Sequence, residues 1–198
     1  MTFENTLEFA KKLDSQDQLH KYQDQFIFPQ VNGKKVIYFT GNSLGLQPKR
    51  SKEYVDEVMN DWANLAVEGH FYSEKPWWDY HERFANPLSK IVGALPTEVT
   101  VMNTLTVNLH LLMVSFYRPT KTRYKIICEE KAFPSDQYMF QSQVHFHGYK
   151  PEDAIVEIKR RNGEHNIRLE DVAAKIEEVG EELALVLIGG VNYYTGQV

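Results

Sequence analysis

The chain has 198 residues, of which 22 are basic and 27 acidic, giving a formal net charge of −5. Apolar residues make up 42% and charged residues 25%, and these proportions exclude a disordered tail or a collagen-like repeat. The acidic balance argues against nucleic acid as a partner, because phosphate binding requires clustered lysine and arginine.

Two further features of the sequence concern the compartment. No apolar run approaches the roughly 20 residues that span a bilayer, and the first residues lack a signal-peptide pattern, so no membrane partner is expected. The single cysteine, Cys128, excludes an intrachain disulfide and a thiolate-rich zinc site. We therefore expect a protein of the reducing cytoplasm.

The beginning of the chain is predicted to be helical and then extended. Residues 1–25 have a helical pattern, with a capping box at residues 15–18 before a short second helix. Residues 35–39 are rich in β-forming side chains and end at a tight turn, where two glycines flank Asn42 and Ser43. This turn allows the backbone to approach a ligand closely.

A second helical stretch follows this turn. Pro48 suits the first turn of a helix, and apolar residues at helical spacing continue to about residue 67. Residues 68–80 are aromatic-rich without a clear period, which indicates either a plug for an apolar gap or the lining of a pocket. Another helix is expected over residues 79–92.

From residue 95 onward, short apolar strands alternate with helices. The expected strands cover residues 99–102, 124–128, 154–158 and 183–188, and the expected helices cover residues 105–117, 135–146 and 169–179. This alternation predicts an α/β fold with a mostly parallel sheet flanked by helices. We expect a domain boundary between a helical segment, residues 1–94, and an α/β domain, residues 95–198.

Open α/β sheets bind ligands beyond the carboxyl ends of their strands, so the loops that follow strands are the first candidates for a site. One such loop holds Asn103, Thr104 and Thr106 at a helix start, where amides, hydroxyls and the helix dipole suit an anion. The alternative is that Asn103 or Thr104 simply caps the helix.

Two later loops are also chemically rich. In the first, Pro134 stiffens the turn, Ser135 can cap the helix and Asp136 is favourable at a helix start on electrostatic grounds alone. The functional interpretation makes Phe133 a stacking platform and Asp136 the charge partner of a cationic ring. The last loop, residues 189–197, combines glycines with Asn, Tyr and Thr, and forms either a polar floor under a ligand or an ordinary exit turn.

Other motifs are incomplete. His81 and Glu82 begin like a zinc-protease helix, but Ala85 stands where the second histidine is required, so no metal is expected. His145 and His147 lie near a predicted helix end, where a cap or a solvated face is the simpler explanation. The sequence has no phosphate loop, dinucleotide fingerprint or nucleophile elbow of the usual patterns.

Five short motifs, taken together and in this order, resemble the kynureninases, pyridoxal-5′-phosphate (PLP) enzymes of the aspartate-aminotransferase-like fold (fold type I). The motifs are GNSLGLQPK at residues 41–49, GH at 69–70, MNTLTVNLHLLM at 102–113, YKIICEEKAFPSDQY at 124–138 and VNYYTGQ at 191–197. The resemblance implies the N-terminal portion of such an enzyme, with residues 95–198 as the first part of its large PLP-binding domain.

The resemblance assigns six residues at two helix starts to the cofactor: Leu105, Thr106, Phe133, Pro134, Ser135 and Asp136. Leu105, through its backbone amide, and Thr106 match the contacts to the cofactor phosphate. Phe133 matches the residue stacked on the pyridine ring, and Asp136 matches a carboxylate near the ring nitrogen.

At the other positions that the resemblance concerns, some residues match the family pattern and some differ. Ser43 and His70 match positions that face the substrate, whereas Gly189 replaces a serine or threonine that commonly reaches the cofactor. The resemblance places the catalytic lysine that holds PLP beyond Val198, so no catalytic residue is assigned in this chain. Lys131 is the nearest alternative, but a solvated loop charge is its simpler interpretation.

The activity implied by the resemblance is hydrolysis of L-kynurenine or 3-hydroxykynurenine to L-alanine and an anthranilate, in tryptophan degradation and NAD biosynthesis. The family builds its site at a dimer interface, so a homodimer is implied. The alternatives are another fold-type I PLP enzyme, such as a cysteine desulfurase-like lyase or an aminotransferase, and a non-catalytic α/β fragment. The aromatic segment, residues 68–80, favours an aryl substrate.

Overall fold

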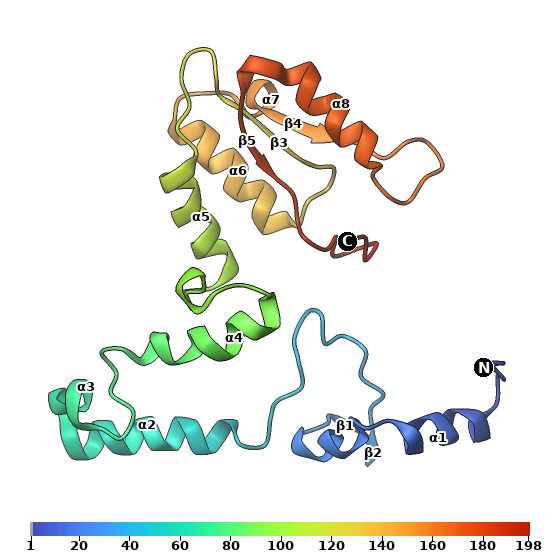
Figure 1. Ribbon diagram of the computed structural model, residues 1–198, viewed down its shortest axis with the longest axis vertical. Coiled ribbons are helices and arrows are strands. Elements are labelled where there is room, and N and C mark those ends of the chain that lie inside the picture. The colour runs from blue at the N-terminus through green and yellow to red at the C-terminus, as the bar shows by residue number, and fades with distance from the viewer. Residues whose placement is uncertain (1) are drawn as a thin grey trace. The chain divides into compact units, whose positions relative to one another are not determined.

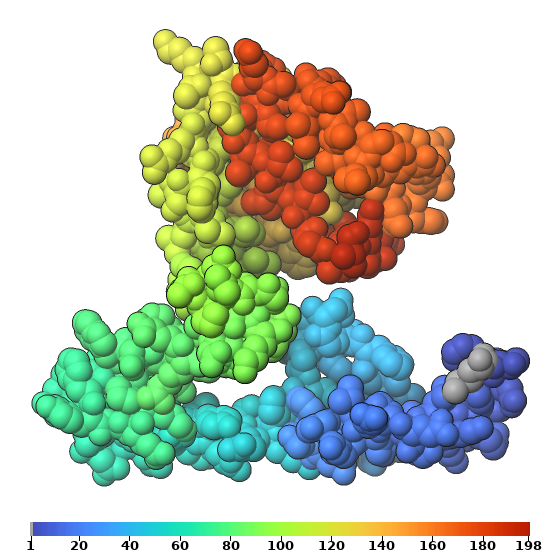
Figure 2. Space-filling view, viewed as in Figure 1, coloured from blue at the N-terminus to red at the C-terminus, as the bar shows by residue number. Residues whose placement is uncertain are grey.

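The computed structural model describes residues 2–198. They form two compact units, of which the first ends at Arg83 and the second comprises Phe84–Val198. Figure 1 shows the elements of each unit in chain order, and Figure 2 shows the atoms of the same chain with the same colours. Each unit is described by itself below.

The first unit consists of helices and one short hairpin. Its elements are α1 (Leu7–Gln16), a 3₁₀ helix (His20–Gln25), β1 (Gln30–Val31), β2 (Lys34–Lys35), α2 (Ser51–Leu65), a 3₁₀ helix (Ala66–Glu68) and α3 (Gly69–Tyr72). The two strands pair antiparallel around Asn32 and Gly33, which both have positive φ angles, as tight hairpin turns require. Another 3₁₀ helix (Tyr80–Phe84) leads into the second unit.

The capping box predicted at residues 15–18 is wrong. Ser15 lies inside α1, and its hydroxyl donates to the carbonyl of Lys12 at 2.8 Å. Within the described residues the second helix, His20–Gln25, has no side-chain cap, whereas α1 is capped by Thr6, whose side chain accepts from the amide of Phe9 at 3.2 Å. The side-chain cap in this region therefore belongs to α1 and comes from the second threonine of the chain.

The predicted strand over residues 35–39 is also wrong beyond its start. The amide of Val36 donates to the carbonyl of Pro29 at 3.0 Å, and the hairpin ends there. Ile37 and Phe39 are 82% and 90% exposed, so their β-forming side chains gain little packing from an extended conformation.

The helix predicted after Pro48 is confirmed, but α2 begins only at Ser51. Pro48 takes part in an isolated β-bridge with Phe26, and its carbonyl accepts from the amide of Ser51 at 3.1 Å, which delays the helix start. The apolar stripe of α2 is exposed in the described chain, with Trp62 62% accessible. Helical spacing thus predicted the helix correctly.

The second unit contains a parallel sheet with helices on its faces. Its elements are α4 (Ala85–Val92), a 3₁₀ helix (Pro96–Glu98), α5 (Leu105–Phe116), β3 (Lys125–Glu129), α6 (Pro134–Phe146), α7 (Pro151–Ala154), β4 (Ile155–Ile158), α8 (Leu169–Val179), a 3₁₀ helix (Gly180–Glu182) and β5 (Leu183–Leu187). The strand order is β4-β3-β5, and both pairings are parallel. The predicted α/β fold with a parallel sheet is therefore confirmed.

The central strand β3 determines the core because its side chains alternate between the two faces of the sheet. On one face, Ile126 and Cys128 are buried against Met139 and other side chains of α5 and α6. On the other face, Ile127 packs with Ile158 and side chains of α8. Burying each such aliphatic side chain contributes about 1.5–3 kcal/mol, so both faces hold the sheet in place.

Two predicted elements of this unit differ from the structure. Residues 99–102 form no strand, because Val101 and Met102 are 37% and 49% exposed and a lone extended segment is not stable without a pairing partner. The helix predicted over residues 79–92 divides into a 3₁₀ helix and α4. Helix α7, which begins with Pro151, was not predicted because its four residues are too short for a periodic pattern.

Candidate functional site

The second and third candidate loops meet at the carboxyl edge of the sheet. β3 and β5 end at the same edge, since they run parallel, and in Figure 1 α5 and α6 both begin on that side. The ring of Phe133, before α6, lies edge-on to the ring of Tyr193, after β5, with centroids 5.1 Å apart. Residues about 60 positions apart in the sequence thus form one site (193 − 133 = 60).

The start of α5 has no side chain that caps it. Thr104 is extended and its carbonyl accepts from the amide of Asn108 at 2.9 Å, but its hydroxyl makes no cap. Asn108 donates its side-chain amide to the carbonyl of Asn103 at 3.2 Å. The alternative that Asn103 or Thr104 caps this helix is therefore wrong, and the first amides, including those of Leu105 and Thr106, remain available to an anion.

The start of α6 is stabilised by proline rather than by a serine cap. Pro134 is the first helical residue, and the hydroxyl of Ser135 donates to Oδ1 of Asp136 at 3.4 Å instead of capping the helix. The amide of Asp136 donates to the carbonyl of Phe133 at 2.8 Å. Gln137 fixes the same loop, because its side chain donates to the carbonyl of Ala132 at 2.6 Å.

The carboxyl of Asp136 is in an environment that disfavours its negative charge. Burial raises its pKa, the hydrogen bond from Ser135 opposes this, and the negative charge of Glu129 adds to the rise. No cation among residues 2–198 forms an ion pair with Asp136. A positively charged group placed beside it would reverse the shift, and a protonated ring nitrogen is such a group.

Glu129 and Asn192 organise the loop after β5, and the sequence interpretation missed Glu129. Its carboxylate, only 8% exposed, accepts from the side-chain amide of Asn192 at 2.9 Å. Asn192 Oδ1 accepts from the amides of Tyr194 and Thr195 at 3.0 and 2.9 Å, and from the Thr195 hydroxyl. The loop is therefore an organised polar structure. The signal in the sequence that could have identified Glu129 is an acidic residue at the end of an apolar strand.

Gly189 leaves room beside this carboxylate. A Cβ at position 189 would lie 3.4 Å from Oε1 of Glu129 and 3.4 Å from the carbonyl oxygen of Val191, which is ordinary contact. Steric crowding therefore does not require a glycine at position 189.

The predicted substrate-facing residues, Ser43 and His70, lie in the first unit. Ser43 is exposed in a turn, where its amide donates to the carbonyl of Thr40 at 3.0 Å. Nδ1 of His70 lies 3.0 Å from the carbonyl of Val67, which can only accept, so the ring carries a proton on Nδ1. Among the described residues, no hydrogen bond or ring contact joins Ser43 to His70.

Aromatic residues hold His70 in place. The ring of Trp77 lies edge-on to His70, with centroids 5.3 Å apart, and the amide of Trp78 donates to the carbonyl of His70 at 3.2 Å. Trp77 also covers Gly69. The aromatic segment therefore packs around the histidine, and Nε2 of His70 has no hydrogen-bond partner among residues 2–198.

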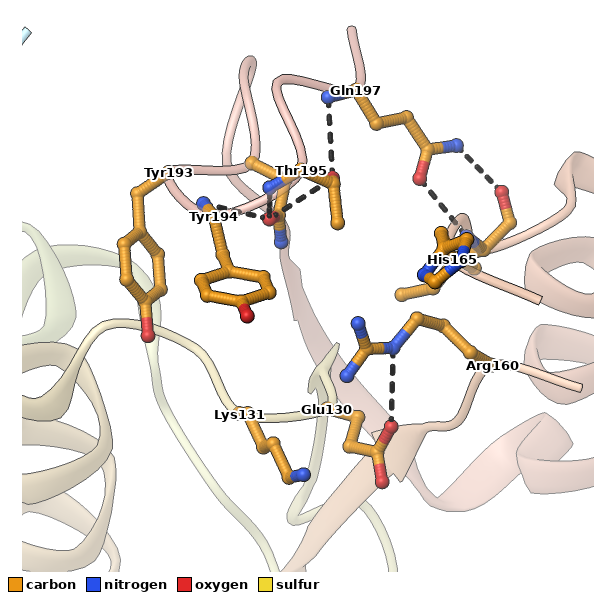
Figure 3. Close-up of a pocket in the computed structure, with 10 residues that line it drawn as sticks. Glu130, Lys131, Arg160, His165, Tyr193, Tyr194, Thr195 and Gln197 are labelled. Atoms are coloured by element: carbon orange, nitrogen blue, oxygen red, sulfur yellow. Dashed lines mark hydrogen bonds and ion pairs between the residues drawn. The ribbon is translucent and has the colours of Figure 1, made fainter. Parts of the chain in front are cut away.

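A cavity of about 310 Å³ lies beside the loops of the sheet edge (Figure 3). Its walls come from three places: Glu130 and Lys131 after β3, Arg160 and His165 after β4, and the loop after β5 that includes Tyr193 and Tyr194. Lys131 therefore lines this cavity. Nε of Arg160 lies 3.5 Å from Oε2 of Glu130.

Two negative findings concern the described part of the chain alone. Within residues 2–198, no group of three or more histidine, cysteine or acidic residues is arranged to hold a metal ion. In the same residues, no helix is both long enough and apolar enough to cross a membrane.

The fold and these loops define an α/β protein with a polar site beyond the carboxyl ends of its parallel strands. No family model matches the chain. It is 86% identical over all 198 residues to a kynureninase of Flavobacterium johnsoniae, 77% identical over its whole length to one of Christiangramia forsetii, and 55% identical over 196 residues to one of Myxococcus xanthus. The chain covers 47%, 47% and 46% of these proteins, about half their length. Over its whole length the chain is therefore similar to kynureninases, of which it spans about half.

Proposed function

We propose that the protein to which these residues belong is a PLP-dependent hydrolase that cleaves L-kynurenine, or 3-hydroxykynurenine, to L-alanine and anthranilate or 3-hydroxyanthranilate. The observation that carries this proposal is the 86% identity, over the whole chain, to a protein named kynureninase. The reaction would serve tryptophan degradation and NAD biosynthesis in the cytoplasm.

The residues at the sheet edge fit PLP as a ligand. The uncapped start of α5 offers the amides of Leu105 and Thr106 to a phosphate, which the helix dipole favours. Phe133 is 48% exposed and held edge-on by Tyr193, so a face of its ring is accessible for stacking. The uncompensated carboxyl of Asp136 suits a cationic ring nitrogen.

When bound, PLP supplies an electron sink for the charge left on the substrate Cα after proton loss. Asp136 contributes by keeping a proton on the ring nitrogen, since its negative charge favours the cationic form. In the first unit, His70 presents Nε2 as a hydrogen-bond acceptor, or as a donor when the ring is protonated, and Ser43 presents a hydroxyl. We assign to both the orientation of the substrate ring and carbonyl.

Three further proposals follow from the family. The complete protein has fold type I, acts as a homodimer and uses a lysine outside the 198 residues to hold PLP and move the Cα proton. Lys131 is not assigned that role, because its side chain lines the neighbouring cavity. The 198-residue chain is therefore expected to be inactive by itself.

Turnover by the full-length protein tests the proposal. We expect release of anthranilate from L-kynurenine, followed by its fluorescence, and dependence on added PLP after dialysis. Cysteine and a set of amino donors with 2-oxoglutarate serve as the competing substrates. Sulfide release or transamination without kynurenine cleavage would replace this proposal with the desulfurase or aminotransferase alternative, and absence of both PLP binding and turnover would favour a non-catalytic protein.

A further inference from the structure

The cavity in Figure 3 is separate from the residues assigned to the cofactor. None of Leu105, Thr106 or the residues 133–136 lines it. Its volume, about 310 Å³, lies within the range of pockets that hold small organic molecules and is far larger than the roughly 30 Å³ occupied by one water molecule. The cavity therefore requires its own explanation.

Arg160 presents unpaired nitrogens to this cavity. Its side chain is only 24% exposed, and Nε is 3.5 Å from the carboxylate of Glu130. The two terminal nitrogens make no hydrogen bond or ion pair with any residue in 2–198, and in Figure 3 they point into the open space. A guanidinium that is mostly removed from water and only partly paired is costly, so an anion in this position would stabilise it.

Lys131 adds a second cation to the lining of the cavity. Its backbone has a φ of +55°, in the left-handed region that side-chain-bearing residues seldom adopt, and its side chain lines the cavity. The flanking backbone is held, because the amide of Glu130 donates to the carbonyl of Ile158 at 2.9 Å. Nζ of Lys131 forms no ion pair within the described chain. Against the single carboxylate of Glu130, the two cations leave an excess of positive charge.

Aromatic rings form the opposite wall. Tyr193 and Tyr194 both line the cavity, and Figure 3 shows the hydroxyl of Tyr194 directed into the same space as the Arg160 nitrogens. Asn192 holds this wall, since its side chain binds the amide of Tyr194 and the carboxylate of Glu129. A ligand here meets positive charge at one end and a tyrosine ring at the other.

We propose that this cavity is a second ligand site, which binds a small aromatic carboxylate with its carboxylate on Arg160 and Lys131 and its ring against Tyr194. An inorganic anion would satisfy the two cations but leave the tyrosine wall and most of the volume unused. A neutral aromatic molecule would leave the guanidinium unpaired.

Isothermal titration of the full-length protein, loaded with PLP, tests this site with benzoate as the probe. We expect benzoate to bind at least tenfold more tightly than each of three comparison ligands. These are benzamide, which lacks the charge, cyclohexanecarboxylate, which lacks the aromatic ring, and inorganic phosphate. Arg160→Gln and Lys131→Gln should each weaken benzoate about tenfold, the loss expected for one charge-assisted hydrogen bond. Glu130→Gln should strengthen it, because a competing carboxylate is removed.

Two matched variants locate the binding. Arg161→Gln removes the same charge one residue away, but Arg161 is bonded to Asp171 at 2.7 and 2.9 Å and does not line the cavity, so benzoate affinity should not change. Arg160→Lys keeps the positive charge and should therefore recover part of the benzoate affinity that Arg160→Gln loses. If Arg160→Gln lost affinity only because it unfolds, restoring the charge would not be expected to recover it. The proposal is overturned if Arg160→Gln binds benzoate like the parent, if phosphate binds as tightly as benzoate, or if His70→Ala abolishes binding while Arg160→Gln retains it.

Discussion

The indole of Trp77 occupies the space where a side chain at position 69 would lie. A Cβ added to Gly69 would lie 2.7 Å from Cη2 of the Trp77 indole, closer than atoms can approach. The two residues are also joined by the backbone, since the amide of Trp77 donates to the carbonyl of Gly69 at 3.4 Å. The position of the indole, and of His70 beside it, therefore depends on the absence of a side chain at residue 69.

We expect Gly69→Ala to displace Trp77 and to lower the free energy of unfolding of the full-length protein by about 1–3 kcal/mol, as overpacking does. Denaturant unfolding followed by tryptophan fluorescence measures both effects. Gly45→Ala is the matched control, because nothing lies within 4 Å of its added Cβ. Equal stability of the two variants would show that the indole moves away at little cost.

The role of His70 is tested separately from its packing. We expect His70→Ala to lower kcat/KM for kynurenine and 3-hydroxykynurenine by about tenfold or more, since one hydrogen bond to the substrate is lost. His145→Ala removes an exposed imidazole at the end of α6 and should leave kcat/KM unchanged. Unchanged kinetics in His70→Ala would remove this residue from the site.

The side-chain amide of Asn192 joins the end of β3 to the loop after β5. Asn192→Ala leaves the carboxylate of Glu129 buried without its partner and releases the amides of Tyr194 and Thr195. The free energy of unfolding should fall by about 1–3 kcal/mol, the cost of leaving buried polar groups unsatisfied. Thermal unfolding compares this variant with Asn166→Ala, which changes an exposed loop residue. A loss no larger than that of Asn166→Ala would contradict the assigned role.

The negative charge of Asp136 should lower the stability of the folded protein without PLP and should raise its affinity for PLP. Because its pKa is raised in the folded protein, the folded state binds a proton more readily than the unfolded state, and stability falls as pH rises from the ordinary pKa through the raised one. Without PLP, Asp136→Asn should therefore be at least as stable as the parent at neutral pH and should lack this fall. Its affinity for PLP should be lower by about tenfold, since a charge-assisted contact is lost.

Asp171→Asn is the control for both measurements, stability and PLP affinity, because the opposite effect on stability is expected. Its pKa is lowered by the hydrogen bond from Arg161, so removing its charge should reduce stability at neutral pH and leave PLP affinity unchanged. Chemical unfolding at several pH values, together with PLP titration, separates the two variants. If Asp136→Asn binds PLP like the parent, the carboxylate does not face the ring nitrogen.

Cys128 should be unreactive while the protein is folded. Burial raises the pKa of its thiol to about 12, and the sulfur lies in the core between the sheet and its helices. At pH 8 almost no thiolate is present, and the thiolate is the reactive form. A colorimetric thiol assay should detect this sulfur only after denaturant is added, and rapid labelling of the native protein would contradict the packing described.

The sequence predicts best where periodicity and end signals coincide. Helix α8 was predicted over its observed residues, because its apolar period ends at Gly180, whose positive φ stops the helix. The strand expected at residues 99–102 failed, since a β-rich composition says nothing about whether a partner strand lies beside it. The apolar stripe of α2 lies on the predicted helix, but its exposure could not be read from the sequence, because spacing identifies a face and not what covers it.

For the site, the sequence supplied the loops but not their contacts. Phe133 and Asp136 are candidates because of their place after a strand, and the edge-on contact of Phe133 with Tyr193 shows that two distant loops meet. Glu129 was missed because it ends an apolar run, and only the structure pairs it with Asn192. The hydroxyl of Thr104 does not cap α5 in the structure, although the residue type favours capping, so the sequence could not predict this.

The strand order β4-β3-β5 has a consequence for handling the protein. β5 lies at a margin of the sheet, so one row of its backbone amides and carbonyls has no strand beside it among residues 2–198. Such a row is a template for another strand. In concentrated solutions of the 198-residue polypeptide, it favours self-association through sheet extension, which a neighbouring strand in the same molecule would prevent.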